Sequence, residues 1–143
     1  MIMKYALIAC VVLGAITACS SSKNSAAELD NLNGYWVLTV FPESTKTLAE
    51  VFVMKTPDLQ LDVPNRKVSG TTGCNRMTGP FTINGEEFQF GNLATTKMGC
   101  PGYDESVYLN AIGKVNRFRL NNDQLSFYSD SALLMTFVKK PNP

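Results

Sequence analysis

The sequence contains no histidine, and that absence excludes several kinds of site. A serine–histidine–aspartate triad, a cysteine–histidine pair, an imidazole zinc site and a histidine base at neutral pH all need the missing side chain. The chain also has little net charge, since 13 basic and 12 acidic residues among 143 give a formal charge of +1. Because Lys4 is the only charged residue before Cys19, the chain from Cys19 onward has equal numbers of basic and acidic residues. No net positive field favours nucleic acid, and we expect no nucleic-acid partner.

The sequence also lacks an apolar run long enough to cross a membrane. The uncharged, mostly apolar stretch at residues 5–18 follows Lys4. As a helix it would reach about 21 Å, against about 30 Å of hydrocarbon. A positive start followed by a short apolar run is typical of a secretory signal peptide. Residues 1–18 are therefore predicted to be a signal peptide and not a stable membrane span.

The predicted signal peptide ends in a pattern that resembles the lipobox of bacterial lipoproteins. Residues 16–19 read Ile-Thr-Ala-Cys. In a lipobox the cysteine thiol carries the lipid, and the cysteine becomes the new N-terminus. The resemblance implies lipidation of Cys19 and a membrane partner reached through that lipid. The alternative is an ordinary secretory signal in which Cys19 is incidental.

A polar, serine-rich stretch follows Cys19. Residues 19–30 have almost nothing apolar to bury, which predicts a flexible tether with a reach of roughly 20 Å. Such a tether would hold a folded domain near a membrane without embedding it. Ser20 resembles outer-membrane sorting better than inner-membrane retention by aspartate. The expected location is therefore the cell envelope, at the outer membrane and facing the periplasm.

The remaining chain, residues 31–140, has the pattern of one domain built mainly of strands. Its composition, 45% hydrophobic and 17% charged over the whole chain, is that of a globular protein, and its length fits a single domain. Apolar and polar residues alternate in short runs bounded by Gly, Pro, Asn and Asp. About eight strands are predicted, at residues 34–41, 59–63, 67–71, 81–83, 88–90, 118–120, 125–127 and 133–138.

One segment has the period of an amphipathic helix. Asp104 and Glu105 stand at its start, where negative charge is favourable to the helix dipole. Its apolar stripe consists of Val107, Tyr108, Ala111, Ile112 and Val115. A single helix cannot alternate with eight strands, which excludes a doubly wound α/β fold. The predicted fold class is α+β and mostly β, with a strongly curved antiparallel sheet packed around one amphipathic helix.

Two motifs in the middle of the chain are more specific than the strand pattern. Residues 70–79 fit G-x-x-G-C-N-x-x-x-G, and residues 95–100 read T-T-K-M-G-C. With the flanking W-x-L, F-R-L and L-x-F segments in the same order, they resemble the META/HslJ-like family of bacterial envelope proteins. The motif positions are Gly70, Gly73, Cys74, Asn75, Gly79, Thr96, Met98 and Cys100.

This resemblance implies a mostly β domain that is often lipidated or secreted and is linked to the heat-shock response and antibiotic tolerance. The family has no established catalytic residues, so none is assigned, and we expect no cofactor or metal. The function we expect is that of a non-enzymatic, lipid-anchored envelope protein. It would be a monomeric binding or stress-protection module for a protein or a small apolar ligand. The alternatives are an inhibitor or assembly factor for one envelope protein partner and, third, an enzyme.

Two cysteines remain for the exported domain, because Cys10 lies in the signal peptide and Cys19 carries the lipid. An even pair in an exported domain predicts a disulfide between Cys74 and Cys100. That bond requires Cα atoms about 4.4–6.8 Å apart. The alternative is two free thiols that pack as small hydrophobic groups. A nucleophilic Cys74 would lack a histidine to accept its proton.

The other motif residues have structural explanations. Gly70, Gly73 and Gly79 are expected to supply positive φ or close backbone approach in a bulged strand pair, since no phosphate-loop sequence surrounds them. Asn75 is expected to hydrogen-bond the backbone of its own turn, with ligand contact as the alternative. The helix dipole accounts for Glu105, which has no evident partner in the sequence.

Overall fold

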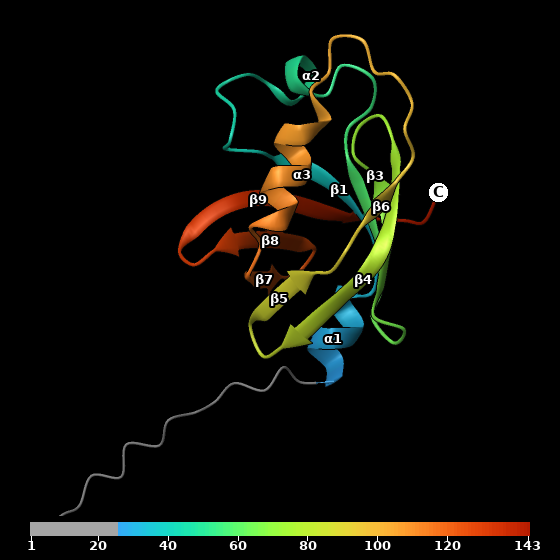
Figure 1. Ribbon diagram of the computed structural model, residues 1–143. Coiled ribbons are helices and arrows are strands. Elements are labelled where there is room, and N and C mark those ends of the chain that lie inside the picture. The colour runs from blue at the N-terminus through green and yellow to red at the C-terminus, as the bar shows by residue number, and fades with distance from the viewer. Residues whose placement is uncertain (1–25) are drawn as a thin grey trace, which may run out of the picture.

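The computed structural model describes residues 26–143, so the signal peptide, Cys19 and the first part of the predicted tether lie outside the described residues. Nine strands and three short helices form within them (Figure 1), and none of these helices could cross a membrane. The strands are β1 Gly34–Val40, β2 Asp58–Asp62, β3 Lys67–Thr71, β4 Arg76–Asn84, β5 Glu87–Phe90, β6 Ala94–Thr95, β7 Arg117–Asn121, β8 Gln124–Ser129 and β9 Ala132–Lys140. The helices are α1 Ala26–Leu32, α2 Leu48–Val51 and α3 Glu105–Gly113.

The strands form one antiparallel sheet that curves back on itself. Their order is β3-β2-β1-β9-β8-β7-β5-β4-β6, and β3 also pairs with β4. Strand β4 is long enough to pair with β3 along one edge and with β6 and then β5 along the other. The sheet is ring-like and not a barrel, and β5 meets β7 at a single residue pair, Glu87 with Arg117.

Side chains on the inner face of the sheet make the hydrophobic core. Alternate residues of a strand face inward, and Trp36 on β1 and Leu59 on β2 are fully buried. Aromatic rings from five strands touch one another with centroids 4.9 to 5.9 Å apart, a geometry that adds to the burial energy. These rings belong to Phe81, Phe88, Phe118, Phe127 and Phe137.

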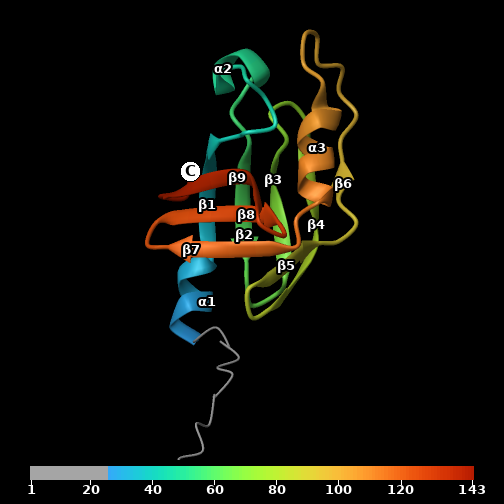
Figure 2. The same ribbon diagram turned by 90° about the vertical axis from the view of Figure 1, so that its left-hand side faces the viewer.

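Helix α3 packs against the sheet, where it contacts β5 and β9 (Figure 2). The predicted apolar stripe is confirmed at its later positions, which are the buried Tyr108, Ala111, Ile112 and Val115. The prediction is wrong for Val107, which is 37% exposed. Its place in the first turn explains this, because that end of α3 extends past β8 and β9 (Figure 1).

The predicted fold class is confirmed, but the helices differ from the expectation of one. Residues 26–30, expected in the tether, belong to α1, because Leu32 is fully buried and the indole Nε1 of Trp36 donates to its carbonyl at 3.0 Å. Helix α2 begins at a capping box formed by Thr47 and Glu50. The additional strand, β6, is too short to show a period of two.

The burial of Leu32 generates the first prediction. Leu32→Ala is expected to lower the free energy of unfolding by about 2–4 kcal/mol, because it leaves a cavity between α1 and the core. Asn31→Ala alters an exposed neighbour and should change that free energy by less than about 0.5 kcal/mol. Urea unfolding of the chain from residue 19 onward, carrying Cys19→Ser, measures both. An equally small effect of Leu32→Ala would show that α1 is not part of the folded domain.

Candidate functional site

The first motif forms the hairpin loop between β3 and β4. The strands separate after the Thr71–Arg76 pair, so residues 72–75 make the loop. The carbonyl of Asn75 accepts from the backbone N–H of Thr72 at 2.9 Å and from the hydroxyl of Thr71 at 3.0 Å, and the hydroxyl oxygen of Thr72 accepts from the backbone N–H of Asn75 at 3.1 Å. Because both threonines and Asn75 are buried, the loop is a bonded part of the core and not a free connection.

Gly70 and Gly73 are required by the backbone of this hairpin. A Cβ atom at Gly70 would lie 2.1 Å from the carbonyl oxygen of Asp58 on the neighbouring strand. Gly73 has a φ of +103°, and a Cβ atom there would lie 3.0 Å from the carbonyl oxygen of Lys55. Neither position can carry a side chain unless the backbone moves. Gly99 in the second motif is different, since the space around it is open.

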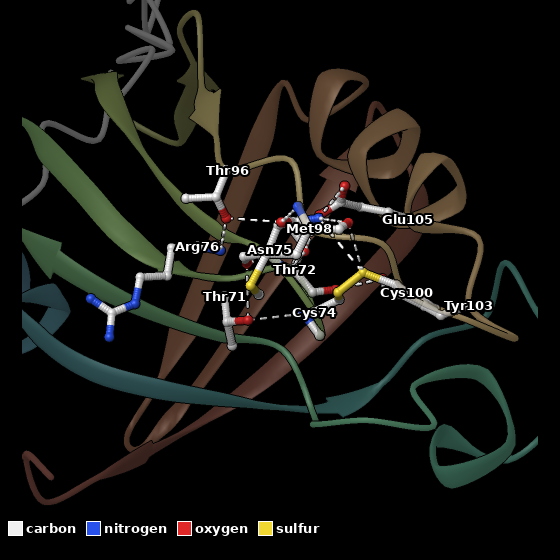
Figure 3. Close-up of a disulfide and its surroundings, with 11 residues drawn as sticks. Thr71, Thr72, Cys74, Asn75, Arg76, Thr96, Met98, Cys100, Tyr103 and Glu105 are labelled. Atoms are coloured by element: carbon white, nitrogen blue, oxygen red, sulfur yellow. Dashed lines mark hydrogen bonds between the residues drawn. A yellow bond between two sulfur atoms is a disulfide. The ribbon is translucent and has the colours of Figure 1, made fainter.

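Cys74 in the hairpin loop pairs with Cys100 in the second motif (Figure 3). Their Cα atoms lie 6.2 Å apart, within the range of a disulfide. The pair joins positions separated by 26 residues and ties the loop to the segment that leads into α3. The two motifs, distant in the sequence, are therefore one site in space.

The side chain of Asn75 makes a second connection between the motifs. Its Oδ1 accepts from the backbone N–H of Met98 at 2.7 Å and from the hydroxyl of Thr96 at 2.8 Å. Its Nδ2 donates to Oε2 of Glu105 at 3.1 Å and lies 3.7 Å from Sγ of Cys100 (Figure 3). The expectation that the Asn75 amide bonds the backbone of its own turn is wrong, since only the backbone of Asn75 bonds within the loop. Its side chain reaches residues 96–105.

Glu105 has a role that sequence reasoning missed. Its carboxylate accepts from Nδ2 of Asn75 and from the hydroxyl of Thr72, so the first turn of α3 is bound to the hairpin loop. The hydroxyl of Tyr103 donates to the carbonyl of Thr72. Burial, together with the charges of Glu105 and Asp104, raises the pKa of Tyr103 well above its ordinary value. Tyr103 is therefore a neutral hydrogen-bond donor at any physiological pH.

We call Thr72, Cys74, Asn75, Cys100 and Glu105 the motif cluster. Its groups are already engaged with one another, since the sulfurs are paired and the carboxylate has two donors. Within residues 26–143 no group of three or more Cys, Asp or Glu side chains could hold a metal ion. The motif cluster is thus a cross-link between a hairpin loop and a helix.

Beside the motif cluster, the outer face of the sheet is hollowed into a groove of about 620 Å³. Strand register builds it, because two neighbouring rows of outward side chains cross the paired strands. The first row contains Asp58, Thr71 and Arg76. The second row contains Tyr35, Ser69, Thr78 and Ala94. We call this the outer groove, and no sequence motif identifies it, because its residues meet only through strand pairing.

Asp58 supplies the carboxylate of the outer groove, and this side chain is buried and has three partners. It accepts from the backbone N–H of Thr71 at 3.0 Å and from the hydroxyl of Tyr35 at 3.0 Å, and Nζ of Lys55 lies 2.8 Å away. Its side chain is 8% exposed, whereas that of Lys55 is 63% exposed. The hydrogen bond to Asp58 raises the pKa of Lys55, and burial followed by the same carboxylate raises the pKa of Tyr35. Both keep their protons at neutral pH.

The Asn75 contacts generate the second prediction. Asn75→Ala is expected to lower the free energy of unfolding by about 2–4 kcal/mol, because groups on two other segments lose their buried partner. Denaturant titration of the chain from residue 19 onward, carrying Cys19→Ser, measures the change. Asn110→Ala, on the exposed face of α3, is the control and should cause no loss. A loss below about 1 kcal/mol for Asn75→Ala would contradict the role assigned to this amide.

The cysteine pair generates the third prediction. Cys74→Ser is expected to lower the free energy of unfolding by about 2–4 kcal/mol, since the bridge restricts the unfolded chain. The reductant dithiothreitol should lower the melting temperature of the wild type and leave that of Cys74→Ser unchanged. A wild-type melting temperature that is the same with and without reductant would show that the native thiols are free.

Comparisons with known proteins place the chain in a family. The sequence pattern of the META domain matches residues 27–142. An NMR structure of a protein from Burkholderia xenovorans is 24% identical with a TM-score of 0.64, covering 99% of this chain and 100% of that one. A second NMR structure is 18% identical with a TM-score of 0.54, covering 74% and 88% of the two chains. A crystal structure of a DUF4847 family protein from Bacteroides vulgatus is 8% identical with a TM-score of 0.58, covering 78% and 95%.

These structural likenesses show the fold alone, and no curated protein matches the chain. The family pattern, in contrast, spans nearly every described residue and includes both motifs and the motif cluster. The resemblance seen in the sequence is confirmed, and the chain belongs to the META domain family.

Proposed function

We propose that this chain is a lipid-anchored, non-enzymatic protein of the bacterial cell envelope whose META domain binds its partner in the outer groove. The observation that carries the binding role is the groove itself. Its volume of about 620 Å³ lies within the range of about 300–1,000 Å³ typical of ligand sites. Paired strands build its floor, so its shape exists before a partner arrives.

The ionisable groups of the outer groove favour binding over catalysis. A general acid or base works best when its pKa lies near the working pH. The pKa values of Lys55 and Tyr35 are raised away from neutrality, and the carboxylate of Asp58 is held by its donors. These groups are suited to presenting a fixed shape and charge to a ligand and are poorly suited to proton transfer.

The proposed anchor would hold the domain close to a membrane. The chain between Cys19 and the start of α1 at Ala26 can span at most about 25 Å when fully extended. Helix α1 lies at one end of the molecule, and α2 lies at the opposite end (Figure 1). An anchor at the α1 end would leave the outer face of β1 to β4 accessible, which supports a tethered binding module. The outer membrane, facing the periplasm, is the location we propose.

The anchor generates the fourth prediction. Cys19→Ser is expected to release the protein from the membrane fraction, because the thiol that carries the lipid is gone. Cys10→Ser changes a cysteine within the predicted signal peptide and should leave membrane association intact. Cell fractionation followed by high-salt washing measures both. A Cys19→Ser chain that still sediments with membranes after the wash would contradict the lipoprotein proposal.

A second candidate is an inhibitor or assembly factor for one envelope protein. Its support is the group of exposed apolar side chains near α2 and the segment before α3. Val53, Met54 and Met98 are 51%, 58% and 57% exposed. The two segments touch through Phe52 and Tyr103, whose ring centroids lie 5.7 Å apart. Apolar side chains gathered on adjoining loops are typical of a protein contact surface.

Crosslinking in intact cells of the native host separates the two candidates. The full lipidated chain is purified, and the bound proteins and small molecules are identified by mass spectrometry. Ser69→Trp would fill the outer groove, and the double substitution Met54→Ser with Met98→Ser would make the loop surface polar. We expect Ser69→Trp alone to lose the partner, at an unchanged melting temperature. Loss only in the double variant would support the second candidate, and an unchanged pattern in Ser69→Trp would contradict the groove proposal.

A further inference from the structure

We propose that the outer groove binds a small amphipathic organic anion, with its single charged headgroup on Arg76 and its apolar body along β3, β4 and β6. This inference rests on the proposed function, that the groove is a binding site, and adds the chemical class of its ligand. It is carried by the bonding of Arg76, by the charge balance of the groove and by the side chains of its floor.

The backbone of Arg76 is fixed, and its guanidinium is available. The Arg76 N–H donates to the hydroxyl of Thr96 at 3.1 Å, and the Arg76 carbonyl accepts from the backbone N–H of Thr96 at 3.0 Å. Figure 3 shows the side chain extending away from the motif cluster. Across residues 26–143 it forms no ion pair. A planar guanidinium with free donors is suited to bidentate contact with an oxyanion.

The charged side chains of the outer groove leave one positive charge unmatched. The ionisable side chains that line it are Tyr35, Lys55, Asp58 and Arg76, and Pro143 also borders it. Asp58 is the carboxylate that could have neutralised Arg76, but Lys55, Tyr35 and the backbone of Thr71 already occupy it. With Tyr35 neutral and Lys55 paired, Arg76 is the charged side chain of the lining that has no charged partner among the described residues. A ligand with one negative charge complements it, whereas a polyanion would find too few partners.

The floor of the groove fits an apolar or mixed body. Small side chains line it on three strands, so a flat ring system or a short chain can lie close to the backbone. These residues are Ser69, Thr78, Ala94 and Thr95. The aromatic ring of Tyr35 borders the floor on the β1 side. A groove of about 620 Å³ is far larger than an inorganic ion needs, which favours an organic anion.

Two fluorescent probes that differ by one charge test this inference. They are 8-anilinonaphthalene-1-sulfonate, a monoanion, and N-phenyl-1-naphthylamine, which has the same ring system without the sulfonate. Each is titrated at low ionic strength into the exported chain carrying Cys19→Ser. Arg76→Gln is expected to weaken sulfonate binding about tenfold and to change binding of the neutral probe less than about twofold. Added salt should weaken binding of the sulfonate only.

Two further variants complete the design. Arg119→Gln removes an exposed arginine on β7, whose guanidinium lies 5.4 Å from the centre of the Tyr128 ring, and should alter binding of neither probe. Ser69→Trp fills the groove and should abolish binding of both. Melting temperatures are recorded for each variant, and Arg76→Gln should melt as the wild type does, because it keeps both backbone bonds to Thr96.

Each contrary outcome overturns a defined part of the inference. If Arg76→Gln binds the sulfonate as tightly as the wild type while Ser69→Trp binds neither probe, the anion assignment is wrong and the groove remains a binding site. If Ser69→Trp still binds both probes, or the wild type binds neither, the groove is not the site of such ligands. The proposed function fails by a separate result, an unchanged crosslinking pattern for Ser69→Trp in cells.

Discussion

The side-chain amide of Asn75 is the interaction on which the arrangement of the domain depends. It is buried in the β3–β4 hairpin loop, yet its partners are Thr96, Met98 and Glu105, which lie between the end of β6 and the first turn of α3. Helix α3 is short and would be marginal alone. Its first turn is fixed because Glu105 is bonded to this amide and to Thr72. The cysteine pair, at disulfide distance, links the same two segments of the chain.

This cross-link also shapes the outer groove. Thr96 is the connecting residue, since its hydroxyl donates to Asn75 and accepts from the backbone N–H of Arg76. Thr96 therefore bonds the motif cluster through Asn75 and also fixes the backbone of β4 at Arg76. Gly70 allows β2 and β3 to approach closely enough for Asp58 to bond Thr71. The family motif thus serves a structural purpose, and the side chains that line the outer groove lie on the strands that it holds in place.

The strands and the cysteine pair could be predicted from the sequence, whereas the contacts made by packing and by strand register could not. Strands β2 and β3 are found within a residue of their observed bounds because a half-buried strand alternates its side chains. The cysteine pair could be predicted because Cys74 and Cys100 are the two cysteines that remain after the predicted signal peptide and Cys19. The bond between Asn75 and Glu105 could not be found, because 30 residues separate them and only the packing of α3 brings them together. Helix α1 could not be predicted because two apolar side chains, Leu29 and Leu32, attach it to the core. The outer groove could not be predicted because it arises from strand register.

A double-mutant cycle on Asn75→Ala and Glu105→Ala tests the central claim most directly, that this hydrogen bond joins the family motif to α3. The two single variants, the double variant and the wild type are unfolded in urea, and the coupling free energy is calculated from their differences. A direct bond between a buried amide and a carboxylate predicts a coupling of about 1–2 kcal/mol. Additive effects, within about 0.5 kcal/mol, would contradict the claim and show that the hairpin loop and the helix are held independently.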